Sequence, residues 1–187
     1  MADTDRLAQL ERKLQYLMDR SDILDCIARN ARGCDRHDSD VLNSSYHADG
    51  TDEHGVVISA GDTYSDYANM VHAASCQQNL HNITTHSCEI DGDEAHAESY
   101  VIGLFLAPDG LTGRLIAGRY VDRLERRDGA WKIALRRSTV DVLLVGDASV
   151  VNEQFFKDMG YLKGMRDKTD ASYQRPLTLE ETPGDRW

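Results

Sequence analysis

Four apolar-rich segments in the second half of the chain, separated by short turn motifs, constrain the fold more than any other feature. They cover residues 83–90, 95–107, 114–125 and 130–145. The connections between them are Asp91-Gly92-Asp93, Pro108-Asp109-Gly110 and Arg127-Asp128-Gly129. Clusters of Asp, Gly and Pro are typical of tight turns between antiparallel strands. The sequence therefore predicts a four-stranded antiparallel meander.

Helical patterns precede these strands. Apolar residues three and four apart predict a helix over 4–20, with Leu7, Leu10, Leu14 and Leu17 on one side. Ser21 and Asp22 match the N-cap and first turn of a second helix, which we expect to end at Gly33. Asp35 would then lie just beyond a helix end.

A short helix over 38–46, a strand over 50–60 and a helix from Asp62 to about residue 78 complete the first half. Tyr67, Met70, Val71 and Ala74 are expected along one side of that last helix. Helices followed by strands predict an α+β protein, with the helices packed on one face of a curved sheet. We expect one domain, residues 1–146, followed by a C-terminal extension, 147–187, that contains a short helix near 150–156 and is not a separate domain.

Charge and cysteine content restrict the partners. A formal net charge of -11 disfavours nucleic acid and anionic membranes, both of which require a positive face. The chain has no apolar run of about 18 residues and no signal-peptide core, so we expect a cytoplasmic protein. The four cysteines have no C-x-x-C spacing and are expected to be free thiols.

Three segments carry a family resemblance: residues 31–38, residues 47–55 and residues 118–131. Together with the order of helices and strands, they closely resemble the SnoaL-like branch of the nuclear transport factor 2-like superfamily over about residues 5–145. The resemblance implies a conical α+β barrel: N-terminal helices packed in a strongly curved, mostly antiparallel sheet around an apolar pocket. The superfamily includes dehydratases, a dehydrochlorinase, formaldehyde lyases, isomerases, cyclases and non-catalytic binders, so the fold alone does not decide the activity.

The same resemblance implies a catalytic pair, with His81 as general base and Asp35 as the carboxylate that orients it. Histidine is suited to this role because its ordinary pKa of about 6.5 lies near neutral pH. No metal or organic cofactor is needed. Further polar side chains are expected to hold the substrate: Asn30, His54, Tyr120, Arg136 and, beside His54 on its strand, Asp52.

The residues alone leave structural alternatives open. His81 could bind backbone at a strand start, and Asp35 could pair with Arg32 or Arg36. Arg136 could be a buried partner of Asp122 or Glu98, and Tyr120 could belong to the core. Asp52 and His54 are disfavoured as metal ligands, because two ligands do not close a site and His37 and His47 are expected on the surface.

Our leading hypothesis is a cofactor-independent lyase that acts on a mostly apolar, cyclic or aromatic, hydroxylated small molecule such as an aromatic or steroid compound. The reaction would be dehydration, or a related cleavage such as loss of formaldehyde from an aryl diol. The alternatives are an isomerase or polyketide-cyclase type of enzyme, and a non-catalytic binding or partner subunit. Trimeric dehydratase relatives imply a homo-oligomer, a trimer rather than a dimer, with the extension as a lid or subunit contact.

Overall fold

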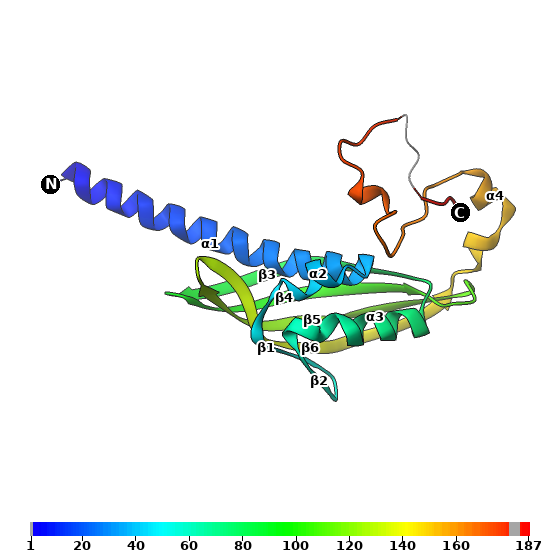
Figure 1. The fold of residues 1–187 in the computed structure, drawn as a ribbon, viewed down its shortest axis with the longest axis horizontal. Coiled ribbons are helices and arrows are strands. Elements are labelled where there is room, and N and C mark those ends of the chain that lie inside the picture. Colours follow the sequence, from blue (N-terminus) through cyan, green and yellow to red (C-terminus); the bar gives the residue numbers. More distant parts are fainter. Residues whose placement is uncertain (1, 180–183) are drawn as a thin grey trace.

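The computed structural model describes residues 2–179 and 184–187, which form helices packed against a curved sheet (Figure 1). The elements in chain order are α1 (Ala2–Arg36), α2 (Ser39–Asn43), β1 (Tyr46–His54), β2 (Val57–Ala60), α3 (Tyr64–Ser75), β3 (Gln78–Asp91), β4 (Glu94–Leu106), β5 (Thr112–Arg127), β6 (Ala130–Asp147) and α4 (Gln154–Asp158). The predicted α+β class is confirmed.

The sheet has six strands in the order β2-β1-β6-β5-β4-β3. Strands β3 to β6 form the predicted antiparallel meander. Two of its turns contain Gly92 and Gly129 at φ of 60° and 78°, a backbone conformation that glycine adopts without strain. β1 runs parallel to β6, so the sheet is mixed. It curves strongly but does not close, because β2 and β3 are its two edges.

The single strand predicted over residues 50–60 is wrong. This stretch is a hairpin in which β1 and β2 pair antiparallel, with His54 opposite Val57. Gly55 lies at the turn with a φ of 68°, and a Cβ at this position would meet no other atom. A glycine that can take this conformation permits the tight reversal.

Helix α1 is continuous over 35 residues, so the predicted break at Ser21 and Asp22 is wrong. Serine and aspartate each disfavour a helix interior by well under about 1 kcal/mol. The fully buried Ile23 and Ile27 directly after them outweigh that cost. Despite the length of α1, no helix among the described residues is apolar enough to cross a lipid bilayer.

Gly33 is inside α1 and not its C-cap. A Cβ on Gly33 would lie 2.6 Å from the backbone nitrogen of Leu42, so glycine at this position lets α2 pack directly against α1. The helix continues to Arg36, which places Asp35 in its last turn and not beyond its end.

Helix α3 begins at Tyr64, after a 3-10 turn that contains Asp62, and it ends at Ser75. Its buried side carries Tyr64, Ser65 and Ala68, whereas Met70 is 61% exposed. Of the apolar residues predicted along one side, Tyr67 packs against the core. Four residues beyond Ala68, on the inner side, the helix presents His72.

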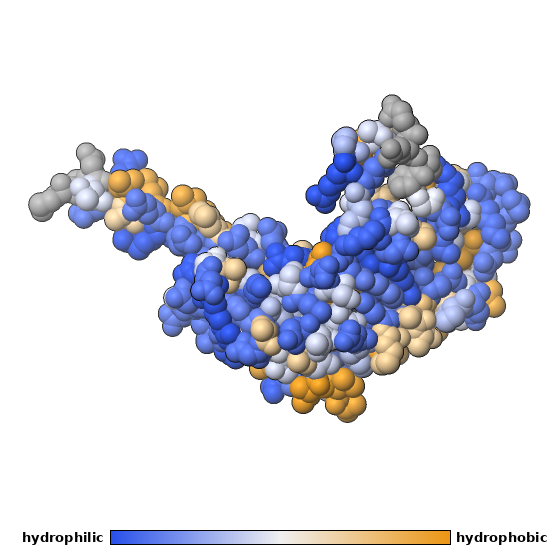
Figure 2. Space-filling model, viewed as in Figure 1, coloured by the Kyte–Doolittle hydropathy of each residue, from blue (hydrophilic) through white to orange (hydrophobic). Residues whose placement is uncertain are grey.

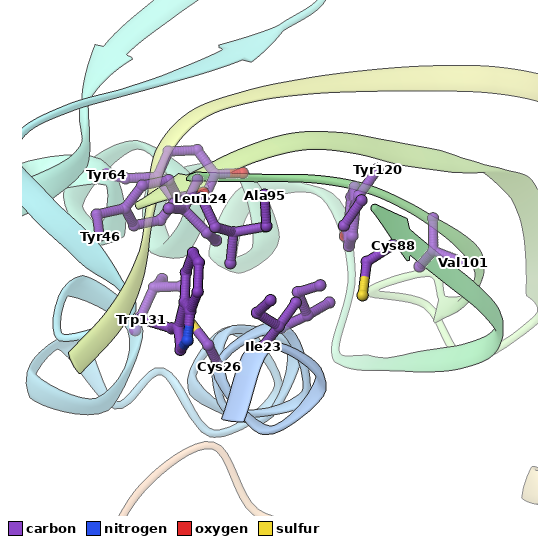
Figure 3. Packing of buried hydrophobic residues seen from close by; sticks show 14 of the residues in the cluster. Ile23, Cys26, Tyr46, Tyr64, Cys88, Ala95, Val101, Tyr120, Leu124 and Trp131 are labelled. Carbon is purple, nitrogen blue, oxygen red and sulfur yellow. The ribbon is translucent and has the colours of Figure 1, made fainter. Parts of the chain in front are cut away.

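The core lies between α1, α2, α3 and the concave face of the sheet (Figure 3). Ile23 and Cys26 of α1 face Leu124 and Trp131 of β5 and β6. All four cysteines are buried free thiols. Burial of large apolar side chains, each contributing about 1.5–3 kcal/mol, is the main favourable term here.

The C-terminal extension folds back over one end of the sheet (Figure 1). Arg36 near the end of α1 forms an ion pair with Asp170 at 3.1 Å. The side-chain amide of Gln78 donates to the carbonyl of Gly164 at 2.8 Å, and Lys168 pairs with Asp38. The extension thus covers the ends of α1 and α3 and the start of β3, while its role as lid or subunit contact stays a prediction.

Candidate active site

Asp35 and His81, which are 46 positions apart in the chain, meet in the structure. Nδ1 of His81 lies 2.7 Å from Oδ1 of Asp35. The backbone N–H of His81 also donates to Oδ2 of Asp35, at 2.9 Å. Asp35 therefore holds both the main chain and the ring of His81, which fixes the direction of the imidazole.

The position of Asp35 is unfavourable for a helix, and β3 supplies the compensation. A carboxylate in the last turn of a helix faces the negative end of the helix dipole. Asp35 is also 5% exposed, so it requires hydrogen-bond donors. The side-chain amide of Asn79 donates to Oδ1 of Asp35 at 3.1 Å, in addition to the two groups of His81. The helix itself does not favour a carboxylate at position 35. The hydrogen-bond donors of Asn79 and His81 on β3 stabilise it there.

The other ring nitrogen of His81, Nε2, is available. No described residue forms a hydrogen bond with it. The ring of Phe105 meets the imidazole edge-on, with 5.6 Å between centroids, and the ring of His72 lies 5.5 Å away on another side. His81 is thus ordered through Nδ1 and surrounded by rings, with Nε2 left to contact a bound molecule.

His72 is a site residue that the sequence reasoning missed. Burial, together with the neighbouring His81 and His37 rings, lowers the pKa of His72 to about 3, so it is neutral at physiological pH. Its Nδ1 is buried without a hydrogen-bond partner among the described residues. The sequence signal that could have found His72 is its spacing, because it follows the buried Tyr64 and Ala68 at steps of four residues on one side of α3.

Arg136 is buried in a closed polar network. Its guanidinium binds the carboxylate of Asp122 in bidentate fashion, at 2.8 Å and 2.7 Å. A third donor reaches the amide oxygen of Asn30 at 2.7 Å, and the guanidinium carbon lies 3.9 Å from the centroid of the Tyr120 ring. Burial alone would lower the pKa of Arg136, but the Asp122 carboxylate holds it well above its ordinary value.

The expected substrate-binding residues Asn30, Tyr120 and Arg136 therefore contact one another. Asn30 also donates to the hydroxyl of Ser45 at 2.9 Å, so both ends of its amide are bonded within the protein. The structural alternative in which Arg136 pairs with Asp122 is the arrangement observed. A substrate-binding role for these three side chains stays a prediction.

Asp52 and His54 form a second polar group near α3. Asp52 is 1% exposed and accepts a hydrogen bond from the hydroxyl of Tyr46 at 2.5 Å. His54 has 44% of its side chain exposed, and its Nδ1 lies 3.6 Å from Asp52 and 3.2 Å from the Tyr64 hydroxyl. Within the described ranges, these residues belong to no group of three that could hold a metal ion.

Two histidines expected on the surface are not there. His47 is 7% exposed, and its Nε2 lies 2.9 Å from the carbonyl oxygen of Glu125. His37 is half-buried and stacks on His72, with 5.9 Å between ring centroids. The rings of His37, His72 and His81 therefore follow one another between the end of α1, α3 and β3.

Asp35 and His81 themselves line a small cavity of about 320 Å³. A separate and larger cavity of about 710 Å³ includes neither of them, but it is lined by Arg36 and by Gln78 and Leu80 at the start of β3. Asn79, which binds Asp35, and Phe105, which meets His81, both line it. The rest of its wall comes from the ends of β4, β5 and β6 and from the extension, and is mainly apolar. Representative lining residues are Leu104, Leu106, Leu144, Val151 and Trp187. This volume lies within the range of about 300–1,000 Å³ that is typical of small-molecule sites.

Comparison by sequence identifies the family. The SnoaL-like domain pattern matches residues 15–137, which include both members of the pair. This chain belongs to the SnoaL-like family. A search of curated proteins gives no match.

Solved structures show the same architecture. A hexachlorocyclohexane dehydrochlorinase of type 2 is 25% identical, with a TM-score of 0.67, over 72% of this chain and 93% of that chain. A Mycobacterium tuberculosis protein of unknown function is 26% identical, with a TM-score of 0.61, over 68% and 74%. A candidate scytalone dehydratase from Novosphingobium aromaticivorans is 15% identical, with a TM-score of 0.63, over 69% and 88%, and shows the fold alone. SnoaL-like proteins that resemble this chain thus include a dehydrochlorinase, and others have no known function.

Proposed function

We propose that this SnoaL-like protein is a cofactor-independent lyase in which His81 is the general base and Asp35 orients it. The observation that carries the proposal is the 2.7 Å contact between Nδ1 of His81 and Asp35, two residues that line one cavity of about 320 Å³, with Nε2 of His81 free of hydrogen bonds from the described residues. A carboxylate on one imidazole nitrogen fixes the tautomer and stabilises the imidazolium formed when the other nitrogen takes a proton.

The proposed step is an elimination. Nε2 of His81 removes a proton from a substrate carbon, and the electron pair of that C–H bond forms a carbon–carbon double bond. The bond to the leaving group on the neighbouring carbon breaks, and a departing hydroxide takes a proton to leave as water. In loss of formaldehyde from an aryl diol, the same base would deprotonate the terminal hydroxyl group, whose oxygen forms the C=O bond of formaldehyde as the C–C bond breaks. The electron pair of that C–C bond forms a carbon–carbon double bond, and the second hydroxyl group takes a proton and leaves as water.

A group that holds the departing or carbonyl oxygen is also required, and we favour His72 for it. Its ring lies 5.5 Å from that of His81, and its buried Nδ1 has no partner among the described residues. A neutral imidazole can donate one hydrogen bond from either nitrogen. Asn30 and Arg136 are less suited, because their polar atoms already bind Ser45, Asp122 and each other.

The larger cavity favours an apolar, cyclic or aromatic substrate. Its wall is mainly aliphatic, with Phe105 and Trp187 as aromatic members, and such surfaces bind hydrocarbon rings through burial of apolar area. The dehydrochlorinase relative is named for hexachlorocyclohexane, an apolar ring compound. An isomerase or cyclase would use the same base and return the proton to another carbon.

We also propose a homo-oligomer, a trimer rather than a dimer, as the assembly of the folded body. Tyr100, Val121 and Val142 are exposed, and the strand register places them on the face of the sheet that points away from the core. Exposed apolar residues clustered on one face are typical of subunit contacts. Sedimentation of the protein as a monomer would refute this part.

The proposal is tested by turnover of a panel of hydroxylated aromatic compounds, hydroxylated steroids and chlorinated cyclohexanes. We expect His81→Ala and Asp35→Asn to lower the turnover of any accepted compound by at least about 100-fold, the lower end for loss of a general base. His96→Ala is the matched control, because the His96 side chain is 67% exposed and distant from the pair in the sheet register. Folding of each variant is checked by circular dichroism. Turnover that both site substitutions leave unchanged would exclude the pair.

A further inference from the structure

The first half of α1 projects beyond the rest of the fold (Figure 1). The first side chains of α1 that contact the sheet are Asp19, which accepts from the indole N–H of Trp131 at 2.9 Å, and Arg20, which donates to the carbonyl of Cys88 at 3.2 Å. Residues 4–18 are exposed, apart from the partly buried Ala8. An isolated helix of this length is marginal in water, so packing against another surface would stabilise it.

The projecting segment carries an unpartnered apolar stripe, which we call the α1 stripe. It consists of Leu7, Leu10, Leu14, Leu17 and Leu24. The first four of these side chains are each more than half exposed. Figure 2 shows hydrophobic residues along this part of the molecule. Four exposed leucines on one side of a helix are unusual, because folded chains rarely expose large contiguous apolar patches.

The spacing of the stripe is that of a coiled coil. Steps of three, four and three residues place its leucines at the first and fourth positions of successive heptads, with Ser21 at the intervening first position. At 3.6 residues per turn, Leu7, Leu10, Leu14 and Leu17 are centred roughly 140° around α1 from Ile23 and Ile27, which enter the core, whereas Leu24 is only about 60° from Ile27. A second helix can therefore pack on the stripe without meeting the sheet of its own chain.

We propose that the α1 stripe pairs in parallel with the α1 stripe of a second copy of this chain. The flanking charges select this occupant. The positions that precede the stripe in each heptad are basic, Arg6, Lys13 and Arg20, and those on its other side include the acids Glu11 and Asp25. In a parallel pair, the basic side of one helix faces the acidic side of the other, and Arg6 lies opposite Glu11 of the partner.

An antiparallel pair would place like charges together. Arg6 would face Arg20, Lys13 would face Lys13 of the second copy, and in the same register Glu11 would face Glu11 of the second copy. Like charges at close range destabilise helix pairs, and natural coiled coils select orientation through these flanking positions. This interface is on the helix, remote from the exposed sheet face, so it is independent of a trimer built through the sheet.

Cysteine cross-linking tests the pairing and its direction. All four native cysteines are buried, so a cysteine introduced on the stripe is the accessible thiol. We expect Leu10→Cys and Leu17→Cys each to form a disulfide-linked dimer with oxidised glutathione, because equivalent positions meet in a parallel pair. Arg12→Cys, on the outer side of the helix, is the control and should remain uncross-linked. Cross-linking only in a mixture of Leu7→Cys with Leu17→Cys, which would face each other in that register, would establish the antiparallel pair and refute the proposal.

Light scattering gives an independent readout. Leu10→Ser combined with Leu14→Ser should lower the mass of the native assembly at least twofold, whatever the sheet contributes, with no change in the circular dichroism of the folded body. An unchanged mass together with absent cross-linking would overturn the proposal. Stripe-dependent sedimentation of monomeric protein with anionic lipid vesicles would instead assign the stripe to a membrane surface and would likewise refute it.

Discussion

Loss of one partner of the buried Arg136–Asp122 pair should destabilise the fold strongly. Asp122→Leu would leave the guanidinium of Arg136 fully buried, with the side-chain amide of Asn30 as its one hydrogen-bond partner among the described residues. Removing one member of a buried ion pair typically costs about 3–5 kcal/mol, because the remaining charge is uncompensated. We expect a loss of about 4 kcal/mol in the free energy of unfolding, and a midpoint lower by about 8–16 °C for a chain of this size.

The assay is urea unfolding, followed by circular dichroism and by the fluorescence of the buried Trp131. Asp141→Leu is the matched control, because Asp141 pairs with Arg119 on the same two strands but at the surface. Exposed pairs contribute about 0–1 kcal/mol, so this variant should remain close to the wild type.

The double variant Asp122→Leu with Arg136→Met decides the mechanism. If the cost comes from an unpaired buried charge, removal of both charges should recover most of the lost stability. A double variant that is as unstable as Asp122→Leu alone, or an Asp122→Leu variant as stable as the control, would refute the reasoning.

Three further results are expected. Burial and the rings of His81 and His37 lower the pKa of His72 to about 3, so the unfolded state binds a proton first as the pH falls. The contribution of His72 to stability is therefore complete above about pH 6.5, and it falls toward pH 3 by up to about 1.4 kcal/mol per pH unit. His72→Gln should flatten that slope in urea unfolding at pH 6 and pH 4. Gly118→Ala would place a Cβ 1.9 Å from the carbonyl oxygen of Thr139 and should lower the melting temperature by at least several degrees in calorimetry, whereas Gly146→Ala, with no atom within 4 Å, should not. Asp170→Ala removes the acceptor for two backbone N–H groups and Arg36, so amide exchange should accelerate in residues 164–173 while the core stays protected.

Much of the fold could be predicted because its signals are local. The meander could be predicted from apolar segments separated by Asp-Gly turns, because such turns favour a chain reversal whatever surrounds them. The β1–β2 hairpin was missed because one glycine, Gly55, marks its turn inside an otherwise continuous strand pattern. The continuity of α1 was missed because local cap residues at 21 and 22 compete with the burial of Ile23, which depends on the sheet.

The site was less predictable from the residues themselves. No local pattern links Asp35 to His81, and only the family resemblance suggested that they meet. The inner location of His72 depends on which side of α3 faces the sheet, and the apolar residues along this helix do not decide it, because Tyr67 packs against the core while Met70 is exposed. The bidentate contact that binds Arg136 to Asp122 was one of two structural alternatives, and tertiary packing alone selects between them.

The Asp35–His81 pair and the larger cavity are formed by different parts of the chain. Asp35 and His81 are held by α1 and β3, while most of the cavity wall comes from the strand ends near residues 104–115 and 144–151 and from the extension. Under the proposed function, substrate range and reaction chemistry can therefore evolve separately. Variant libraries confined to those strand ends and the extension would search for new substrates at constant chemistry.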